Sequence, residues 1–146
     1  MKLLAFIAAA ALSIAPAFAQ SNSPAGLWKN IDDKTGKPSA LIRITENNGV
    51  LTGQIEKLFR EANEDPNPKC DKCEGARKDQ PILGMTILSN LKKDGNEYSG
   101  GEILDPKDGE VYKSKLRLTD GGKKLDVRGY IGVPMLGRSQ TWVREQ

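Results

Sequence analysis

The chain has 146 residues, with 22 Lys and Arg against 19 Asp and Glu, two cysteines and no histidine. This length fits one domain after a leader, and no stretch beyond residue 19 approaches the ~18 consecutive apolar residues of a membrane-spanning helix. The lack of histidine excludes histidine general bases, triads and metal ligands, and the interspersed, nearly balanced charge gives no electrostatic case for binding nucleic acid.

Residues 1–19 have the pattern of a secretory signal peptide. Lys2 supplies a positive start, Leu3 to Leu12 is an unbroken apolar run, and Ala17-Phe18-Ala19 is a small-residue cleavage site. The apolar run is too short to span a bilayer. We therefore expect cleavage after residue 19 and an exported protein, periplasmic if the source is a Gram-negative bacterium, with a single domain at 20–146.

The rest of the chain reads as short strands separated by turns. Turn signals rich in Gly, Asn, Asp and Pro recur at short intervals. Between them, apolar and polar residues alternate, which is typical of strands that bury one face. In chain order, the eight predicted strands are near 25–31, 39–46, 50–58, 83–91, 97–104, 110–119, 123–131 and 137–145.

These elements predict an all-β fold, an eight-stranded antiparallel up-and-down barrel with one long loop. Closing the sheet removes its unpaired edges, whereas the alternative, a two-sheet sandwich, generally needs longer crossovers. Short helical turns are also compatible with residues 58–63 and 81–85. A barrel of this size is just wide enough to be filled by side chains or to hold one small ligand.

Gly26-Leu27-Trp28 stands at the start of the first predicted strand. It resembles the Gly-x-Trp pattern at the same place in lipocalins and related small barrels. That resemblance implies that Trp28 packs at a closed end of the barrel, covered by an arginine from the end of the chain, here Arg144. We interpret both residues as structural, joined by a cation–π contact.

Cys70 and Cys73 lie in the longest connection, residues 59–80. In an oxidising compartment the simplest interpretation is a local disulfide. A redox-active pair is typically placed at a helix N-terminus after a strand, and the sequence offers no such helix. Zinc needs four ligands, so the two thiols supply half a site unless Asp71 and Glu74 or a second chain complete it.

Four further blocks follow one another along the chain: Gln80-Pro81-Ile82-Leu83-Gly84, Gly101-Glu102-Ile103-Leu104-Asp105-Pro106 with Gly109 and Tyr112 after it, Arg128-Gly129-Tyr130-Ile131-Gly132, and Gly137-Arg138-Ser139-Gln140-Thr141-Trp142. With the Cys-x-x-Cys motif they resemble a family of exported bacterial proteins known as domain of unknown function 2147. The resemblance covers nearly the whole chain after the signal and implies a lipocalin-like barrel. It implies no activity, because the family has no established one.

The order of the strands also indicates where a ligand would enter. Successive connections of an up-and-down barrel alternate between its two ends, so the connections after the first, third, fifth and seventh strands share one end. Both chain termini, with Trp28 and Arg144, lie at the other end, which is therefore expected to be closed. We expect a ligand to enter beneath the 59–80 loop, whose length is itself a sign of function.

Two residues of the sixth strand are candidates for lining that cavity. Tyr112 and Ser114 share a face with Leu116 and Leu118, which are apolar and expected to point inward. Both polar side chains would then lie on the barrel interior, near the predicted mouth.

The last strand supplies two more candidates, Arg138 and Gln140, which share a face with Trp142. Alternation alone does not decide whether that face points inward. If it does, Arg138 would favour a carboxylate or another anionic group. If it does not, Arg138 lies in water or pairs with an acid such as Asp105, since arginine is rarely buried without a partner.

The predicted function is non-catalytic binding of a small, partly apolar ligand, which is anionic if Arg138 faces the cavity. The alternative is an envelope interaction or stress protein whose barrel is filled, and a cavity volume separates the two, since ligand pockets commonly reach ~300 Å³ or more. Glu102, Asp105, Asp108 and Tyr112 are close in sequence, but Asp-Pro-Lys-Asp-Gly favours a turn. No nucleophile motif accompanies them, so we expect no enzyme, cofactor or metal.

Overall fold

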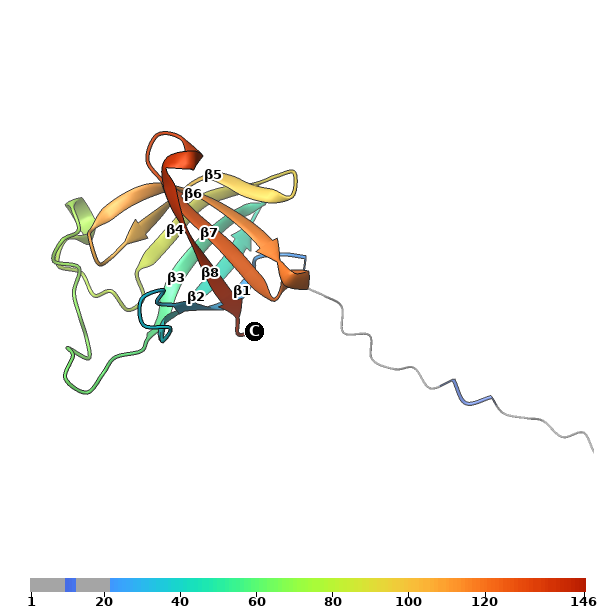
Figure 1. Ribbon diagram of the computed structural model, residues 1–146, viewed down its shortest axis with the longest axis horizontal. Coiled ribbons are helices and arrows are strands. Elements are labelled where there is room, and N and C mark those ends of the chain that lie inside the picture. The colour runs from blue at the N-terminus through green and yellow to red at the C-terminus, as the bar shows by residue number, and fades with distance from the viewer. Residues whose placement is uncertain (1–9, 13–21) are drawn as a thin grey trace, which may run out of the picture.

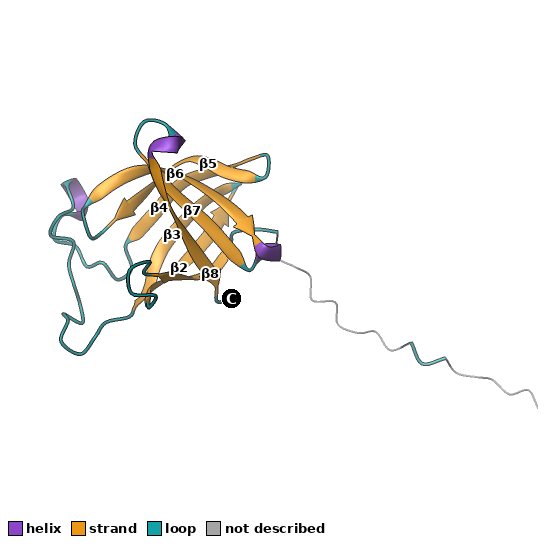
Figure 2. Ribbon diagram, viewed as in Figure 1, coloured by secondary structure: helices purple, strands orange, loops and turns teal. Residues whose placement is uncertain are grey.

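Eight antiparallel strands form a closed barrel in the computed structural model (Figure 1). The structure describes residues 10–12 and 22–146, so the predicted signal at residues 1–19 lies almost entirely outside the described part. The strands are β1 (Gly26–Ile31), β2 (Pro38–Asn47), β3 (Val50–Leu58), β4 (Thr86–Asp94), β5 (Glu97–Asp105), β6 (Glu110–Thr119), β7 (Lys124–Tyr130) and β8 (Gly137–Arg144). Figure 2 shows them as a continuous wall, with three short 3₁₀ turns, η1 (Gly75–Arg77), η2 (Asp120–Gly122) and η3 (Pro134–Leu136).

Seven predicted strands agree with the structure to within one residue at each end, and the fourth is displaced. The sequence predicts it at 83–91, whereas it runs from Thr86 to Asp94. Gly84 has a φ of 86°, which an extended strand does not adopt, and its N–H donates to the Ile55 carbonyl over 2.7 Å. Residues 81–85 therefore form a turn rather than a strand end, and neither 58–63 nor 81–85 is helical.

The barrel closes through direct pairing of the first and last strands. Each strand is hydrogen-bonded to the next in sequence, and β1 pairs with β8 with Trp28 opposite Arg144 and Asn30 opposite Trp142. This pairing leaves neither strand as an unpaired edge and rules out the two-sheet sandwich. It also brings residues from the two ends of the chain onto one wall of the barrel.

One half of the barrel interior is solidly packed. Ile44, Leu51, Leu91, Leu116 and Leu125 are each at most 1% exposed. They lie toward the turns that join β2 to β3, β4 to β5 and β6 to β7. The alternation of the sequence predicts these inward positions because one face of each strand has to be apolar.

The same end is closed by Trp28 and Arg144. Trp28 is fully buried, and its indole N–H donates to the Pro24 carbonyl over 2.7 Å. The guanidinium of Arg144 lies over the indole ring, and it donates to the carbonyls of Gly122 (2.7 Å), Ala25 (3.0 Å) and Ser23 (2.7 Å). Partial burial lowers the pKa of Arg144. The guanidinium thus has hydrogen-bond acceptors for its N–H groups, and its position over Trp28 closes this end of the barrel.

Steric crowding explains why the first residue of the Gly-x-Trp motif is glycine. Gly26 has a φ of 141°, and a Cβ at this position would lie 2.5 Å from the Gln146 carbonyl oxygen and 2.7 Å from Arg144 Nη1. Only a residue without a side chain lets the C-terminal segment pass, with Leu27 N–H donating to the Gln146 carbonyl over 3.0 Å.

Cys70 and Cys73 form the predicted disulfide, with an S–S distance of 1.95 Å. Both are buried, at 0% and 2% exposure, in the same apolar cluster as the barrel core. Gly109, in the turn between β5 and β6, lies beneath this segment, since a Cβ there would come within 1.9 Å of the Lys72 carbonyl oxygen. The closed disulfide and the burial of both sulfur atoms indicate that the pair anchors the loop.

Candidate functional site

A cavity of about 640 Å³ occupies the other half of the barrel. It opens at the end that carries the loops after β1, β3, β5 and β7, which is the end at which the strand order predicts the mouth. The long loop after β3 contributes Pro68 and Ile82 to its lining. The volume exceeds the ~300 Å³ that small-molecule pockets commonly reach.

The deeper walls of this cavity are mainly apolar. They come from facing strands around the barrel: Ile42, Ile55, Ile87, Ile103, Val127 and Trp142. Burying an apolar ligand against such walls is favourable by roughly 25 cal/mol per Å² of apolar surface removed from water.

The structure resolves which face of β8 points inward. Trp142 is 1% exposed and lines the cavity, and Gln140 and Arg138 line it with Trp142. Gln140 Oε1 accepts from Trp142 Nε1 at 3.4 Å and from Asn30 Nδ2 at 3.5 Å. Asn30 was not among the sequence candidates, although it stands two residues after Trp28 and hence on the same face of its strand.

Arg138 lies at the rim of the cavity and is paired. Its Nη2 is 3.1 Å from a carboxylate oxygen of Asp33, and the Arg138 side chain is 61% exposed. The acid is Asp33 of the loop after β1, not Asp105. The guanidinium is therefore neither in a dry interior nor without a counter-charge.

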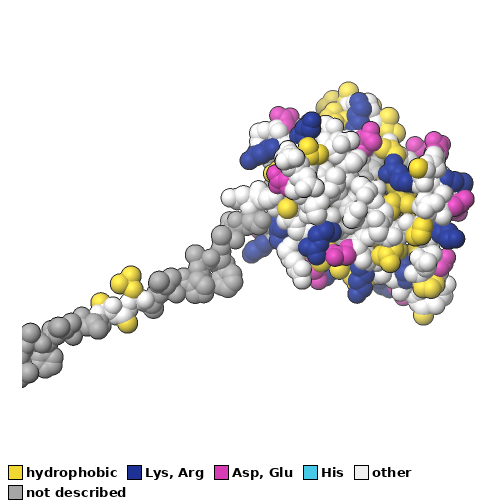
Figure 3. Space-filling model, turned by 180° about the vertical axis from the view of Figure 1, so that it is seen from behind, with side chains coloured by type: hydrophobic (Ala, Val, Ile, Leu, Met, Phe, Trp, Pro, Cys, Tyr) yellow, Lys and Arg dark blue, Asp and Glu magenta, His cyan; other side chains and the backbone are white. Residues whose placement is uncertain are grey.

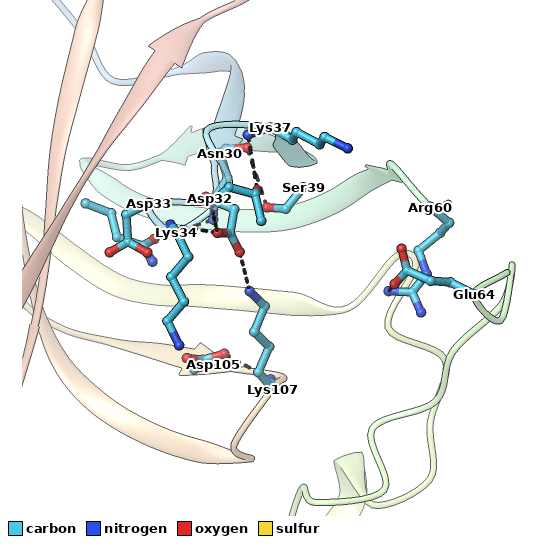
Figure 4. Close-up of polar contacts among 12 residues, drawn as sticks. Asn30, Asp32, Asp33, Lys34, Lys37, Ser39, Arg60, Glu64, Asp105 and Lys107 are labelled. Atoms are coloured by element: carbon cyan, nitrogen blue, oxygen red, sulfur yellow. Dashed lines mark hydrogen bonds and ion pairs between the residues drawn. The ribbon is translucent and has the colours of Figure 1, made fainter. Parts of the chain in front are cut away.

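A second ion pair joins two of the mouth loops. Lys107 Nζ lies 3.0 Å from Asp32 Oδ2, while Asp32 Oδ1 accepts the backbone N–H groups of Lys34 (2.8 Å) and Thr35 (2.9 Å) (Figure 4). These hydrogen bonds, led by the one from Thr35, hold the pKa of the Asp32 carboxyl well below its usual range. Asp32 thus stays ionised and links the loop after β1 to the loop after β5.

The charged residues that line the cavity all lie at the mouth. Arg60 pairs with Glu64 over 3.2 Å, and Lys34 points toward Asp105 in Figure 4 without an ion pair in the described part of the chain. Positive and negative side chains are also interspersed over the face shown in Figure 3. The cavity lining itself includes four acidic and four basic residues, so the rim is balanced in charge.

Tyr112 lies at the rim of the cavity, where its hydroxyl donates to Asp108 Oδ2 over 2.6 Å. This hydrogen bond to a carboxylate raises the pKa of Tyr112 to about 12, so the phenol stays neutral at ordinary pH. The Tyr112 hydroxyl is thereby held by the neighbouring turn instead of pointing free into the cavity.

Ser114 points into the barrel but lies outside the cavity lining. It is fully buried, and its Oγ is the one buried side-chain polar atom without a partner in the described residues. It pairs across the sheet with Gly101 and Gly129, and the side chains of Ile103 and Tyr112 pack beside Gly129. Of the four sequence candidates, Tyr112, Arg138 and Gln140 meet at the cavity and Ser114 does not.

An apolar loop borders the mouth on one side. In the connection between β7 and β8, Ile131 is 64% and Leu136 is 76% exposed, and both also line the cavity. Arg128, on the outer face of β7, fixes this loop by donating to the carbonyls of Pro134 (2.5 Å) and Gly137 (3.3 Å). Turn composition predicts this loop but not the arginine that holds it.

No helix in residues 10–12 and 22–146 is long and apolar enough to cross a membrane. The chain matches no protein with curated annotation. It is similar in fold to protein HP1028 from the human pathogen Helicobacter pylori, which is described as belonging to the lipocalin family. The TM-score is 0.71 at 18% sequence identity, and the similarity covers 85% of this chain and 84% of that one. At this identity the likeness concerns the fold.

The model of a family described as uncharacterised proteins conserved in bacteria (DUF2147) matches residues 26–144. The match begins at the glycine of the Gly-x-Trp motif and ends at the arginine that covers its tryptophan, and so spans all eight strands. This chain belongs to the DUF2147 family and has a lipocalin-like barrel fold.

Proposed function

We propose that this protein is an exported binding protein that holds a small, partly apolar ligand in its barrel without transforming it. The observation that carries the proposal is the cavity of about 640 Å³ with mainly apolar walls, closed at the Trp28 end and bordered by loops at the other. A barrel that worked only through its outer surface would need no such space, because close packing is the usual state of protein interiors.

Export is supported by two features of the chain. The first 19 residues have the pattern of a signal peptide, and the Cys70–Cys73 disulfide suits an oxidising compartment such as the periplasm. Expression of the full chain in a Gram-negative host tests this part. N-terminal sequencing of the periplasmic protein is expected to begin at Gln20, whereas an uncleaved cytoplasmic product would contradict export.

The acidic groups near the mouth are already engaged in structure. Asp108 accepts the Tyr112 hydroxyl, and Asp105 accepts the Lys107 backbone N–H over 2.9 Å. Hydrogen bonds of this kind shape a turn, so both carboxylates have a structural role in the loop after β5. They favour binding over catalysis.

A fluorescence titration with N-phenylnaphthylamine, an uncharged apolar dye, tests the binding function. The wild-type barrel is expected to bind the dye and enhance its emission. Ala40→Phe fills the cavity from β2, where Ala40 lines the wall, and is expected to lower dye affinity at least about tenfold.

Leu41→Phe is the matched control, because Leu41 is the next residue of β2 and has the opposite orientation. It is expected to leave dye binding unchanged. Absence of binding to the wild type, or equal binding by Ala40→Phe, would overturn the proposed function in favour of a surface-acting protein.

A further inference from the structure

Two amide side chains form a polar spot beside the apolar walls of the cavity. Asn30 comes from β1 and Gln140 from β8, and they meet because these strands pair to close the barrel. An indole N–H can only donate, so the Gln140 atom 3.4 Å from Trp142 Nε1 has to be the oxygen. The group of Asn30 that meets the same oxygen is in turn its NH₂. Trp142 thereby fixes the orientation of both amides.

This orientation leaves one donor and one acceptor open. The NH₂ of Gln140 and the Oδ1 of Asn30 have no hydrogen-bond partner among residues 22–146. Within this part of the chain, Ser114 Oγ is the one fully buried side-chain polar atom that lacks a partner. The two open amide atoms are therefore not fully buried. Both residues line the cavity, so these two groups are accessible to a molecule inside it.

The charges of the site disfavour an ionised ligand group at this depth. Three of the four cations that line the cavity, Arg138, Lys107 and Arg60, are paired with Asp33, Asp32 and Glu64, and the fourth, Lys34, lies in the loop after β1 and points toward Asp105 (Figure 4). The lining cation nearest in sequence to the amide pair is Arg138, two residues before Gln140 on the same face of β8, and its guanidinium is already paired with Asp33. A carboxylate moved there would lose part of its hydration, Arg138 would have to give up Asp33 to pair with it, and the Asn30 oxygen would repel it.

We infer that the ligand of the proposed binding function is uncharged and carries a carboxamide or hydroxyl group on an apolar body. Its oxygen accepts from the Gln140 NH₂, and its N–H or O–H donates to Asn30 Oδ1. The apolar body lies against the isoleucine-rich walls. Asn30 and Gln140 are then the residues that determine specificity, with Trp142 positioning Gln140.

Three probes with the same apolar body test this inference: para-butylbenzamide, para-butylbenzoate and para-butyltoluene. Each is titrated at neutral pH against the dye-loaded barrel. A well-placed hydrogen bond typically changes affinity by up to about tenfold, so the benzamide is expected to bind about tenfold more tightly than the toluene and the benzoate.

Variants then assign this preference to the amide pair. Gln140→Leu and Asn30→Leu are each expected to abolish the advantage of the benzamide while leaving toluene affinity within about threefold. Gln140→Glu keeps the oxygen that accepts from Trp142 and removes the NH₂, so this variant is also expected to lose the preference for the benzamide. It keeps the test valid if a leucine variant folds poorly. Thr141→Val, on the outer face of β8 where Thr141 donates to Asp126, is the control and is expected to change nothing.

The outcomes separate this inference from the function on which it rests. If the dye and the toluene bind but the benzoate binds as tightly as the benzamide, or the variants keep the benzamide preference, the inference is wrong and the binding function stands. If neither the dye nor any of the three probes binds the wild-type barrel, the binding function itself is wrong.

Discussion

The guanidinium carbon of Arg144 lies 4.3 Å from the centroid of the Trp28 ring, and the two residues face each other across the β1–β8 pair that closes the barrel. The same guanidinium satisfies three backbone carbonyls from the segment before β1 and the turn before β7. One side chain therefore ties both ends of the chain to the barrel.

Arg144→Met keeps the aliphatic stem and removes these interactions. We expect it to lower the free energy of unfolding by about 2–4 kcal/mol, the sum of a cation–π contact and the lost hydrogen bonds. Denaturant unfolding followed by Trp fluorescence measures the change. Arg117→Met is the control, since Arg117 is 54% exposed and pairs with Asp126 at 3.7 Å. An equal loss in the two variants would show that the closed end does not depend on Arg144.

Removing the disulfide is expected to loosen the long loop while the barrel stays folded. Replacing Cys70 and Cys73 together by alanine would cost about 2 kcal/mol from the small closed loop, with a further loss from the buried sulfur atoms. Limited proteolysis is expected to cut the variant within residues 59–85 faster than the wild type. Reductant should have the same effect on the wild type and none on the variant, and equal cleavage rates in all cases would contradict the anchoring role.

Gly109 and Gly36 form a matched pair for testing how the loop rests on the barrel. Both have positive φ, +75° and +71°, so alanine at either position meets the same backbone penalty of about 1 kcal/mol. A Cβ at Gly109 additionally collides with Lys72, whereas one at Gly36 has nothing within 4 Å. We expect Gly109→Ala to lower the melting temperature clearly more than Gly36→Ala, and equal melting temperatures would refute the close approach.

Tyr112 is expected to ionise later than an ordinary tyrosine. Its pKa is raised from 10.0 to about 12 because its hydroxyl donates to the Asp108 carboxylate. A raised pKa in the folded state stabilises the fold fully below about pH 10 and loses this contribution as pH rises through about 12. Absorbance at alkaline pH follows the phenolate, with Tyr112→Phe to assign the signal. Asp108→Asn is expected to lower the pKa of Tyr112, and an unchanged titration would rule out this hydrogen bond as the cause.

The strands could be predicted because their alternation is a local property. Ile42 and Ile44, for example, point inward as the pattern of β2 indicates. The sequence predicts the start of β4 too early because Leu83 continues an apolar pattern, which Gly84 interrupts with its positive φ. The periodicity of apolar residues does not reveal a turn of this kind.

The site was predicted less completely, since it depends on contacts between distant residues. Asn30 and Gln140 meet across 110 residues, and Arg138 and Asp33 across 105, because β1 pairs with β8 in one particular register. No local pattern specifies that register. For the same reason the sequence does not identify Asp33 as the acid that pairs with Arg138.

The close approach of Lys72 to Gly109 divides the long connection between β3 and β4 into two parts. The segment around the disulfide is also tied back on itself, because Lys69 bridges to Pro81 and Cys70 exchanges backbone hydrogen bonds with Asp79 and Gln80. Residues 69–82 therefore form one unit that rests on the turn between β5 and β6, and residues 59–68 form the other part of the connection. That shorter part includes Arg60 and Pro68 of the cavity lining, and the unit around the disulfide contributes Ile82, so both parts of the connection border the mouth.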